Sequence, residues 1–322
     1  MSTTFNSPCH GSTSLYACLF DMPLFGKKKP TVNQVDLPRF FAAVDINISS
    51  FDRFSAERQT INGVETDIMF LEGKPGLPLI YFVHGLGASF RFFYEGILFF
   101  HSLGYSVLAH SRSGELQPLT GELSLESLLA EVETVLAPHK KKKIHIISSS
   151  FGGVISLLTA ERLGSQIKTV TTIGSFLKFE WNLAHDILYD VMRSVQLERV
   201  PARDLGPFAP QIRFIRGRSQ AVMNYVLTEY ETFPQKSLVR YLEILKALNY
   251  ASSAPVVEAE LLFLHGRDDD MVPLSCYEQL KRAYPRARAV LLDNCGHGPF
   301  LSQPEAVYSS VLELMKKSGE PI

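Results

Sequence analysis

The sequence predicts an α/β fold in which a mainly parallel sheet is covered by helices on both faces and carries a helical lid insertion. Buried apolar strands alternate with amphipathic helical patterns through most of the 322 residues, a rhythm typical of parallel sheets. A purely helical pattern interrupts this rhythm between residues 176 and 255. The chain is also long enough for one large domain with a sizeable core.

The first half of the chain should form an antiparallel hairpin and then strands and helices in alternation. Residues 58–71 fit two strands joined at Asn62-Gly63, a dipeptide that favours a tight hairpin turn. Ser124 is a suitable N-cap for the helix expected after it. The later elements are expected as strand 79–83, a helix from about 89, strand 105–109, helix 124–136, strand 143–147, helix 152–163 and strand 167–173.

The second half contains the insertion. Apolar residues recur at helical spacing from residue 176 to about 255, for example at Leu183, Ile187 and Leu188, and we expect a lid over one end of the sheet. The alternation then resumes with strand 260–264, helix 275–283, strand 287–292 and helix 304–317. The core is therefore expected to comprise residues 57–175 and 256–318, with the lid at 176–255.

Residues 1–50 precede this alternation and should form an N-terminal extension that is partly disordered or loosely docked. Its apolar stretch, residues 15–25, contains Asp21 and Pro23 and is followed by three lysines at 27–29. A secretion signal carries its charges before the apolar run, and a spanning helix needs about 20 apolar residues. We therefore expect neither a signal peptide nor a stable membrane anchor.

Charge and cysteine content argue against several classes of partner. A formal net charge of −1 provides no general attraction to nucleic acid or anionic membranes. The four cysteines lack metal-ligand spacing and are too few for a disulfide scaffold. They favour a reducing compartment, and a cytoplasmic location is expected.

Three consecutive serines, residues 148–150, stand between a buried strand and a helix that begins on two glycines. This context is typical of a nucleophile elbow, a strained turn that needs small residues two positions before and after the nucleophile. Ser150 has small residues at both positions, Ser148 and Gly152, whereas each of the other serines would place a bulky side chain at one or both of them. Ser150 is therefore the candidate nucleophile.

The chain resembles the α/β-hydrolase-fold serine hydrolases, of the lidded kind that includes many carboxylesterases and lipases, over residues 57–318. The resemblance depends on the segments "HGLGAS", "SSSFGG", "GRDDDMVP" and "NCGHGPFLSQPE". Two segments depart from the family pattern. Ser148 replaces the first glycine of the usual G-x-S-x-G elbow, a sterically mild change. The loop "HSRSGE" stands where many members have an Asp and further glycines, which leaves the packing of this loop open.

A serine hydroxyl needs a base to take its proton and an acid to orient that base. The family order is Ser, then Asp or Glu, then His. His297, in "CGHGPF", follows the last expected strand between glycines that let the loop reach the elbow, and it is the candidate base. His84 is expected to brace the loop that follows it, and His265 to be a hydrogen-bonded structural residue.

Three consecutive aspartates compete for the role of the acid: Asp268, Asp269 and Asp270. Alignment of the flanking residues with the family places the acid at Asp269. Asp268 and Asp270 are then expected to cap backbone N–H groups. The cluster lacks the convergent pattern of oxygens that a hard cation requires, so no metal and no cofactor are expected.

The transition state of acyl transfer carries a negatively charged oxygen, which needs donors already in place. The resemblance places these donors at the backbone N–H groups of Phe151 and Leu86. Phe90, Phe176 and Phe179 lie beside expected strand ends, where pockets form in open α/β sheets. We therefore expect a small-molecule substrate, an ester or acyl compound with a small or medium apolar group.

These features predict an ester hydrolase that works by two-step acyl transfer through a Ser150 acyl-enzyme, with water as the acceptor. The same triad serves thioesterases, acyltransferases and some carbon–carbon bond hydrolases. A non-catalytic α/β-hydrolase-like binding protein is a second alternative, although a decayed triad would be expected there and all three positions are filled. A membrane-associated lipase that docks by its N-terminal apolar stretch is a third.

Overall fold

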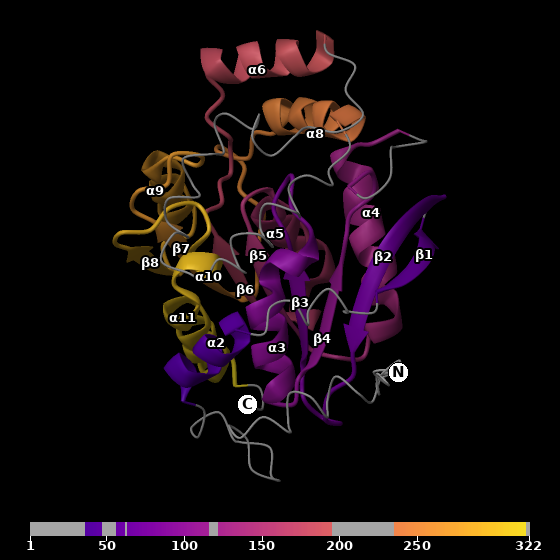
Figure 1. Ribbon diagram of the computed structural model, residues 1–322, viewed down its shortest axis with the longest axis vertical. Helices are drawn as coiled ribbons and strands as arrows, with labels where there is room; N and C mark the ends of the chain where they lie inside the picture. The colour runs from indigo at the N-terminus through magenta and orange to yellow at the C-terminus, as the bar shows by residue number, and fades with distance from the viewer. Residues whose placement is uncertain (1–35, 47–55, 62, 116–121, 195–234, 320–322) are drawn as a thin grey trace, which may run out of the picture.

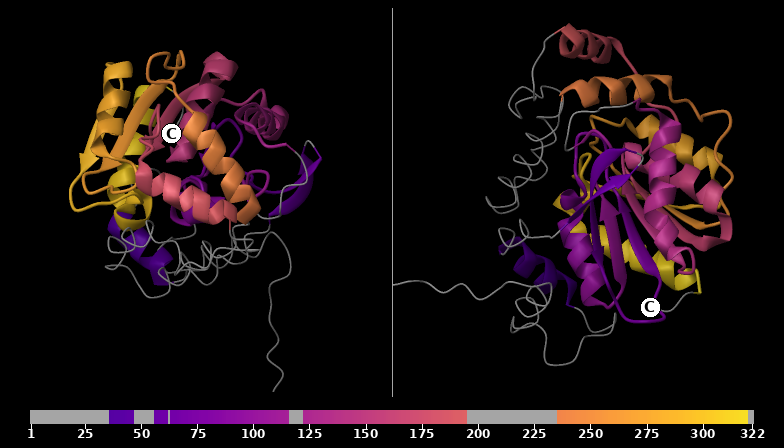
Figure 2. Two further views of the ribbon diagram at one scale, coloured as in Figure 1. Left: turned by 90° about the horizontal axis from the view of Figure 1, so that it is seen from above. Right: turned by 90° about the vertical axis from the view of Figure 1, so that its right-hand side faces the viewer.

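A computed structural model describes residues 36–46, 56–61, 63–115, 122–194 and 235–319. Its centre is an eight-stranded sheet with the strand order β1-β2-β4-β3-β5-β6-β7-β8. Helices cover both faces of this sheet (Figures 1 and 2). The predicted fold class, a mainly parallel doubly covered sheet, is therefore confirmed.

The sheet begins with an antiparallel hairpin and continues in parallel. β1 (Glu57–Ile61) pairs with β2 (Val64–Leu71), and the register places Ile61 opposite Val64 across the turn. Gly63 has a φ of 82°, which suits glycine in a tight turn. β2 also pairs antiparallel with β4, and the remaining neighbours are parallel. Those strands are β3 (Leu79–Val83), β4 (Ser106–His110), β5 (Ile144–Ser149), β6 (Ile167–Ile173), β7 (Glu260–Gly266) and β8 (Arg288–Leu292).

Two groups of helices bury their apolar sides on opposite faces of the sheet. One cluster of buried side chains joins the sheet to α2 (Leu37–Ile46), α3 (Tyr94–Ser102) and α11 (Pro304–Lys317). The other joins it to α4 (Leu125–Leu136), α5 (Phe151–Leu163) and α9 (Leu274–Ala283). Because both faces are covered, β3, β4 and β5 are buried along their whole length. This explains why their sequences are largely continuous apolar runs, without the alternation of apolar and polar residues that a half-exposed strand shows.

The expected strands and helices of the core lie within a few residues of their predicted bounds. Ser124 caps α4 as predicted, and its side chain accepts a hydrogen bond from the N–H of Ser127. The helix expected from about residue 89 has a different start. A short 3₁₀ helix, η3 (Phe90–Phe93), comes first, with Ser89 as its N-cap. Short helices η4 (Ala137–His139), η5 (Gly164–Gln166) and α10 (Pro299–Ser302) complete the described core.

The N-terminal region contains a helix that the sequence pattern did not predict. Within the expected extension, α2 buries Phe40, Phe41 and Val44, each at most 5% exposed. Phe40 packs on Phe99 of α3, and Phe41 stacks on Tyr308 of α11. Residues 1–35, including the apolar stretch 15–25, lie outside the described residues. No helix in the described part of the chain is both long and apolar enough to cross a membrane.

The helical block predicted at 176–255 is described in part, because residues 195–234 lie outside the described residues. Its two described helices are α6 (Leu183–Ser194) and α8 (Gln235–Ala247). Figure 1 shows both helices above one end of the sheet. The hydroxyl of Tyr241 on α8 donates to the carbonyl of Ser113, 2.8 Å away in the loop that follows β4. α8 therefore lies at the carboxyl end of the parallel strands.

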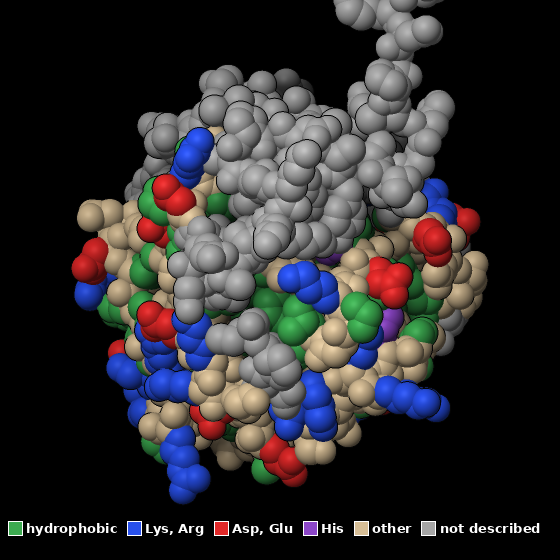
Figure 3. Space-filling view, turned by 90° about the horizontal axis from the view of Figure 1, so that it is seen from below, with side chains coloured by type: hydrophobic (Ala, Val, Ile, Leu, Met, Phe, Trp, Pro, Cys, Tyr) green, Lys and Arg blue, Asp and Glu red, His purple; other side chains and the backbone are tan. Residues whose placement is uncertain are grey.

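The end of the molecule opposite to α6 and α8 has a surface on which charged side chains of both signs are mixed. Seen from below, Lys and Arg side chains are interspersed with acidic and uncharged ones over the described part of this face (Figure 3).

Candidate active site

Ser150 lies in the sharp turn between β5 and α5, and its backbone is strained. Its φ of 52° and ψ of −126° are rarely adopted by a residue with a side chain. Two hydrogen bonds hold the turn. The Ser150 N–H donates to the carbonyl of Ile173 at 2.8 Å, and the Ser175 hydroxyl donates to the carbonyl of Ser150 at 2.9 Å. Strain of this kind persists only where the surrounding structure enforces it.

The packing around the turn explains why small residues flank Ser150. A Cβ atom on Gly152 would lie 2.4 Å from the carbonyl oxygen of His84 and 2.5 Å from that of Val83, which is too close for any side chain. On the other side, Ser148 is fully buried, and its hydroxyl donates to the carbonyl of Thr171. Ser150 is partly exposed, in contrast to its two serine neighbours.

Asp269 and His297 form a hydrogen-bonded pair. The Oδ2 atom of Asp269 lies 2.8 Å from Nδ1 of His297. Asp269 follows β7 and its side chain is buried, whereas the His297 side chain, in the loop between β8 and α10, is 14% exposed. The pair places the second imidazole nitrogen, Nε2, on the far side of the ring from the carboxylate.

The structure also distinguishes Asp269 from the aspartates on either side. Asp269 is 7% exposed, while Asp268 and Asp270 are both exposed. Its second oxygen, Oδ1, accepts from the N–H groups of Met271 and Val272, both at 2.9 Å. Asp269 therefore accepts hydrogen bonds from backbone N–H groups, a role that was expected of the neighbouring aspartates.

Two opposing effects determine the ionisation of Asp269. Burial by itself would raise the pKa of this carboxyl. The charge of His297 and the hydrogen bonds that the carboxylate accepts outweigh this effect, so the pKa of Asp269 lies below its usual value. His265 contributes a smaller effect in the same direction. Its Nε2 lies 3.0 Å from the carbonyl of Val272, which confirms the expected structural hydrogen bond.

Ser150 follows β5, whereas Asp269 follows β7 and His297 follows β8, and the end of β6 lies between them. Gly174 directly follows β6, and a Cβ atom on it would lie 3.1 Å from Nδ1 of His297 and 3.2 Å from Oδ2 of Asp269. The residue before it, Ile173, accepts the hydrogen bond from the Ser150 N–H. The sheet thus brings together at one edge the three residues that the sequence had placed far apart in the chain.

The loop that follows β3 lies against this turn. A Cβ atom on Gly85 would lie 3.1 Å from the Cβ of Ser150. Leu86 follows Gly85 directly, and Phe151 is the first residue of α5. An N–H in the first turn of a helix has no acceptor within that helix. Both expected backbone donors are therefore carried by segments that contact or form part of the Ser150 turn.

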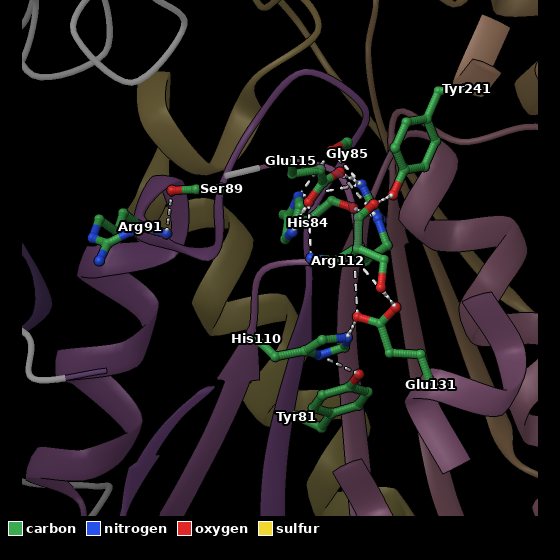
Figure 4. Close-up of polar contacts among 11 residues, drawn as sticks. Tyr81, His84, Gly85, Ser89, Arg91, His110, Arg112, Glu115, Glu131 and Tyr241 are labelled. Carbon is green, nitrogen blue, oxygen red and sulfur yellow. Dashed lines mark hydrogen bonds and ion pairs between the residues drawn. The ribbon is translucent and has the colours of Figure 1, made fainter. Parts of the chain in front are cut away.

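The loop "HSRSGE" forms a buried polar network that sequence reasoning missed (Figure 4). Arg112 and Glu115 are each 2% exposed, and Nη2 of Arg112 lies 2.6 Å from Oε1 of Glu115. His84 joins them, with Nε2 2.9 Å from Oε2 of Glu115. Burial lowers the pKa of His84. Burial would raise the pKa of Glu115, but the charges and hydrogen bonds of Arg112 and His84 bring it below its usual value.

A second set of buried polar side chains also holds the "HSRSGE" loop in place. Ser113 contacts Glu131 of α4 through both its N–H and its hydroxyl. Glu131 also lies 3.4 Å from Nε2 of His110, whose Nδ1 is 3.0 Å from the hydroxyl of Tyr81. The signal available in the sequence was the departure of "HSRSGE" from the family pattern of an Asp and further glycines, since polar residues on a loop this close to the site need partners if they are buried.

The three expected substrate-binding aromatics differ in exposure. Phe90 is 0% exposed and Phe176 is 1% exposed, so both are packed into the interior. Phe179 is partly exposed and makes edge contacts with Phe176, Trp181 and His185. Of the three, Phe179 is therefore the one with surface available to a ligand. Within the described ranges, no group of three or more His, Cys, Asp or Glu side chains could hold a metal ion.

Comparison with known proteins places these features in a family. The family model described as alpha/beta hydrolase fold matches residues 78–304. A pimeloyl-[acyl-carrier protein] methyl ester esterase of Aromatoleum aromaticum is 27% identical over 168 residues, which is 48% of this chain and 67% of that protein. A candidate carbamate hydrolase of Cronobacter turicensis is 23% identical over 244 residues, 72% of this chain and 88% of that protein.

Solved structures share the fold. The crystal structure of a hydrolase from Pseudomonas aeruginosa superposes with a TM-score of 0.71 at 16% identity, covering 82% of this chain and 99% of that one. At this level of identity the similarity concerns the fold alone.

Proposed function

The chain belongs to the alpha/beta hydrolase fold family, and on this premise we propose that it is a serine esterase that cleaves carboxylic esters through a Ser150 acyl-enzyme. The observation that supports this most directly is the hydrogen-bonded pair of buried Asp269 and partly exposed His297, with 2.8 Å between Oδ2 and Nδ1, at the same end of the sheet as the strained Ser150 turn. The named relatives that are esterases agree with an ester-bond hydrolase.

In the acylation step, Oγ of Ser150 attacks the acyl carbon while Nε2 of His297 takes the hydroxyl proton. The C–O bond to the alcohol then breaks, and His297 returns the proton to the departing alkoxide. In the deacylation step, His297 removes a proton from water, which attacks the acyl-enzyme, and the carboxylic acid leaves as Ser150 regains its proton. The reaction consumes one water and needs no cofactor.

Asp269 performs the orienting role. Its hydrogen bond to Nδ1 places the proton of a neutral imidazole on that nitrogen and leaves Nε2 as the acceptor for the Ser150 proton. Because the pKa of Asp269 is lowered, its carboxylate keeps its negative charge at neutral pH. That charge stabilises the imidazolium that forms in each step.

The backbone N–H groups of Leu86 and Phe151 are the proposed donors to the negatively charged oxygen of the tetrahedral intermediates. Both belong to segments that pack on Ser150 or follow it directly. Donors fixed by the backbone need no rearrangement as charge develops. This is the condition under which such hydrogen bonds accelerate a reaction most.

We further propose that residues 176–255 act as a lid and that the substrate carries a small or medium apolar acyl group. Phe179 lies just after β6, and its partly exposed ring continues into an aromatic group with Trp181 and His185. α6 and α8 lie over the same end of the sheet (Figure 1). An apolar wall at this position would contact the acyl chain of an ester bound at Ser150.

Labelling with a fluorophosphonate probe, combined with hydrolysis of p-nitrophenyl esters of increasing chain length, tests this function. We expect one probe molecule per chain, bound at Ser150, and measurable hydrolysis of acetate to hexanoate esters. Peptide mapping of the labelled protein identifies the modified residue. A chain that binds these esters without hydrolysing them and does not react with the probe would instead be a non-catalytic binding protein.

A further inference from the structure

Arg112 is a large charged side chain in an unusual place. It is 2% exposed, and arginines are seldom buried unless every donor finds an acceptor. Glu115 accounts for one side of the guanidinium: Nε lies 3.1 Å and Nη2 lies 2.6 Å from Oε1 of Glu115. The backbone N–H of Arg112 also donates to Oε2 of Glu115 at 2.9 Å. The two residues therefore form one rigid unit within the loop that follows β4.

The other side of the guanidinium points at the loop that follows β3 (Figure 4). Nη1 donates to the carbonyl of His84 at 2.6 Å, and Nη2 donates to the carbonyl of Gly85 at 2.7 Å. Nδ1 of His84 lies 2.9 Å from the same Gly85 oxygen. Two consecutive carbonyls of this loop are thus held by a single side chain.

The carbonyl of Gly85 and the N–H of Leu86 belong to the same peptide unit. The unit is planar, and the described residues contain no cis peptide bond, so this C=O and this N–H point in opposite directions. A hydrogen bond that fixes the Gly85 oxygen therefore also fixes the direction of the Leu86 N–H. Donation to the oxygen polarises the amide as well, which strengthens its N–H as a donor.

The guanidinium also lies beside the second donor segment. Its central carbon is 5.5 Å from the centroid of the Phe151 ring and 5.8 Å from that of Tyr241, within the range of cation–π attraction. Phe151 carries the other proposed oxyanion donor. Arg112 therefore contacts both segments whose N–H groups would bind the oxyanion.

We infer that Arg112 is a positioning residue that holds the Gly85–Leu86 peptide in the orientation needed for oxyanion binding, with Glu115 fixing the guanidinium. This inference rests on the proposed esterase function. A planar guanidinium can reach two carbonyls and a carboxylate at once, whereas a lysine ammonium presents its donors from one point and cannot span them.

The test is Arg112→Lys, with Arg162→Lys as the matched control. Arg162 is also held by two carboxylates, Glu126 and Glu133, but lies at the far end of α5 on the surface. Reactive sites are counted by complete labelling with the fluorophosphonate probe, so that kcat refers to folded enzyme. Binding is measured for a trifluoromethyl ketone, which forms a tetrahedral oxyanion adduct with the serine.

For Arg112→Lys we expect kcat per reactive site to fall about 10- to 100-fold, less than the loss on removing an oxyanion donor outright. KM for p-nitrophenyl butyrate should stay within about threefold, because the effect concerns the transition state. The inhibition constant of the trifluoromethyl ketone should rise by the same factor as kcat falls. Arg162→Lys should leave all three values unchanged.

Glu115→Gln provides a second variant if Arg112→Lys does not fold. It keeps the shape of the side chain but weakens the hold on the guanidinium, and we expect a smaller fall in kcat with the same unchanged KM. An unchanged kcat per reactive site in either folded variant would overturn the inference and leave Arg112 a stabilising residue only. Failure of the wild-type chain to hydrolyse esters or react with the probe is a separate result, which would overturn the proposed function and this inference together.

Discussion

Oδ2 of Asp269 lies 2.8 Å from Nδ1 of His297, although 28 positions separate the two residues in the chain. The contact exists because β7 and β8 are parallel neighbours and their following loops emerge at the same edge of the sheet. Asp269 is buried there with both oxygens occupied, while the aspartates on either side face solvent. This asymmetry within three consecutive aspartates makes their roles separable by mutation.

Asp269→Asn should keep the fold and lower kcat by about 10⁴-fold, by analogy with the equivalent change in a serine protease. The amide cannot stabilise the imidazolium and favours the wrong tautomer of His297. Asp268→Asn and Asp270→Asn are the matched controls, since both side chains are exposed and should retain activity within a few-fold. Steady-state kinetics on one ester measures all three. A large loss at either control, with Asp269→Asn near wild type, would move the acid to that neighbour.

Ser150→Ala should abolish labelling by a fluorophosphonate probe and lower turnover by several powers of ten, because the nucleophile is removed. Ser149→Ala should label at nearly the wild-type rate, since the Ser149 side chain is buried beside the turn rather than at its exposed tip. Gel fluorescence of the labelled proteins compares the two variants directly. Loss of labelling in Ser149→Ala alone would show that the elbow has a different register.

Gly152→Ala should destabilise the protein by about 3 kcal/mol, the upper end of the usual cost of overpacking, because the new Cβ would overlap two backbone carbonyl oxygens. Those are the oxygens of Val83 and His84, at 2.5 and 2.4 Å. Gly298→Ala is the control, since a Cβ there would meet nothing closer than 3.6 Å. Urea unfolding of the two variants measures the difference. Equal stability of both would contradict the packing around the elbow.

Phe179→Ala should change the ratio of kcat/KM for hexanoate and acetate esters by about 5- to 20-fold, as expected when one apolar wall of a pocket is lost. Phe70→Ala is the control, because Phe70 is an exposed aromatic on β2 that packs on His139, away from the site. An equal loss on every chain length would indicate a folding defect rather than a role in the acyl pocket.

Stability should fall as the pH is lowered from 7 to 5, with His145 contributing about 2 kcal/mol of the loss. Burial, aided by the charge of Lys168, lowers the pKa of His145 to about 4. The unfolded chain, with a pKa near 6.5, therefore binds a proton in this window that the folded protein does not, so acid favours unfolding.

The measurement is the free energy of unfolding in urea at pH 7, 6 and 5, for wild type and His145→Asn. The variant starts from a lower stability, because the side chain contacts Thr169, but its dependence on pH should be weaker by about 2 kcal/mol over the interval. Parallel pH curves for the two proteins would show that His145 titrates normally in the folded state.

Local sequence determined the features that depend on short-range geometry. The hairpin at Gly63, the cap at Ser124 and the elbow at Ser150 each follow from which residues tolerate a given turn, and the structure has each of them at the predicted position. The alternation of strands and helices likewise predicted the doubly covered sheet, because the spacing of apolar residues within each element indicates which of its faces are buried.

Exposure of the aromatic residues was decided by packing. Phe90, Phe176 and Phe179 all follow the carboxyl ends of strands, yet two are buried and one is partly exposed. The burial of helix α2 was also not predictable from local sequence, because nothing in its own pattern indicated that Phe40 and Phe41 would enter the main core. Such outcomes depend on which surfaces are left to cover once the sheet has formed.

Apolar patterning and local sterics were enough to predict the sheet and the elbow, and the family resemblance supplied the order of the candidate triad. The position of "HSRSGE" followed only from the folded arrangement: this segment has the composition of a surface loop, yet it lies buried, with Arg112 against the carbonyls of His84 and Gly85. A charged residue can be buried only when its hydrogen-bond partners are supplied. Glu115 is a local partner, but the two carbonyls belong to residues 28 and 27 positions earlier, and their proximity is known only once β3 and β4 lie side by side.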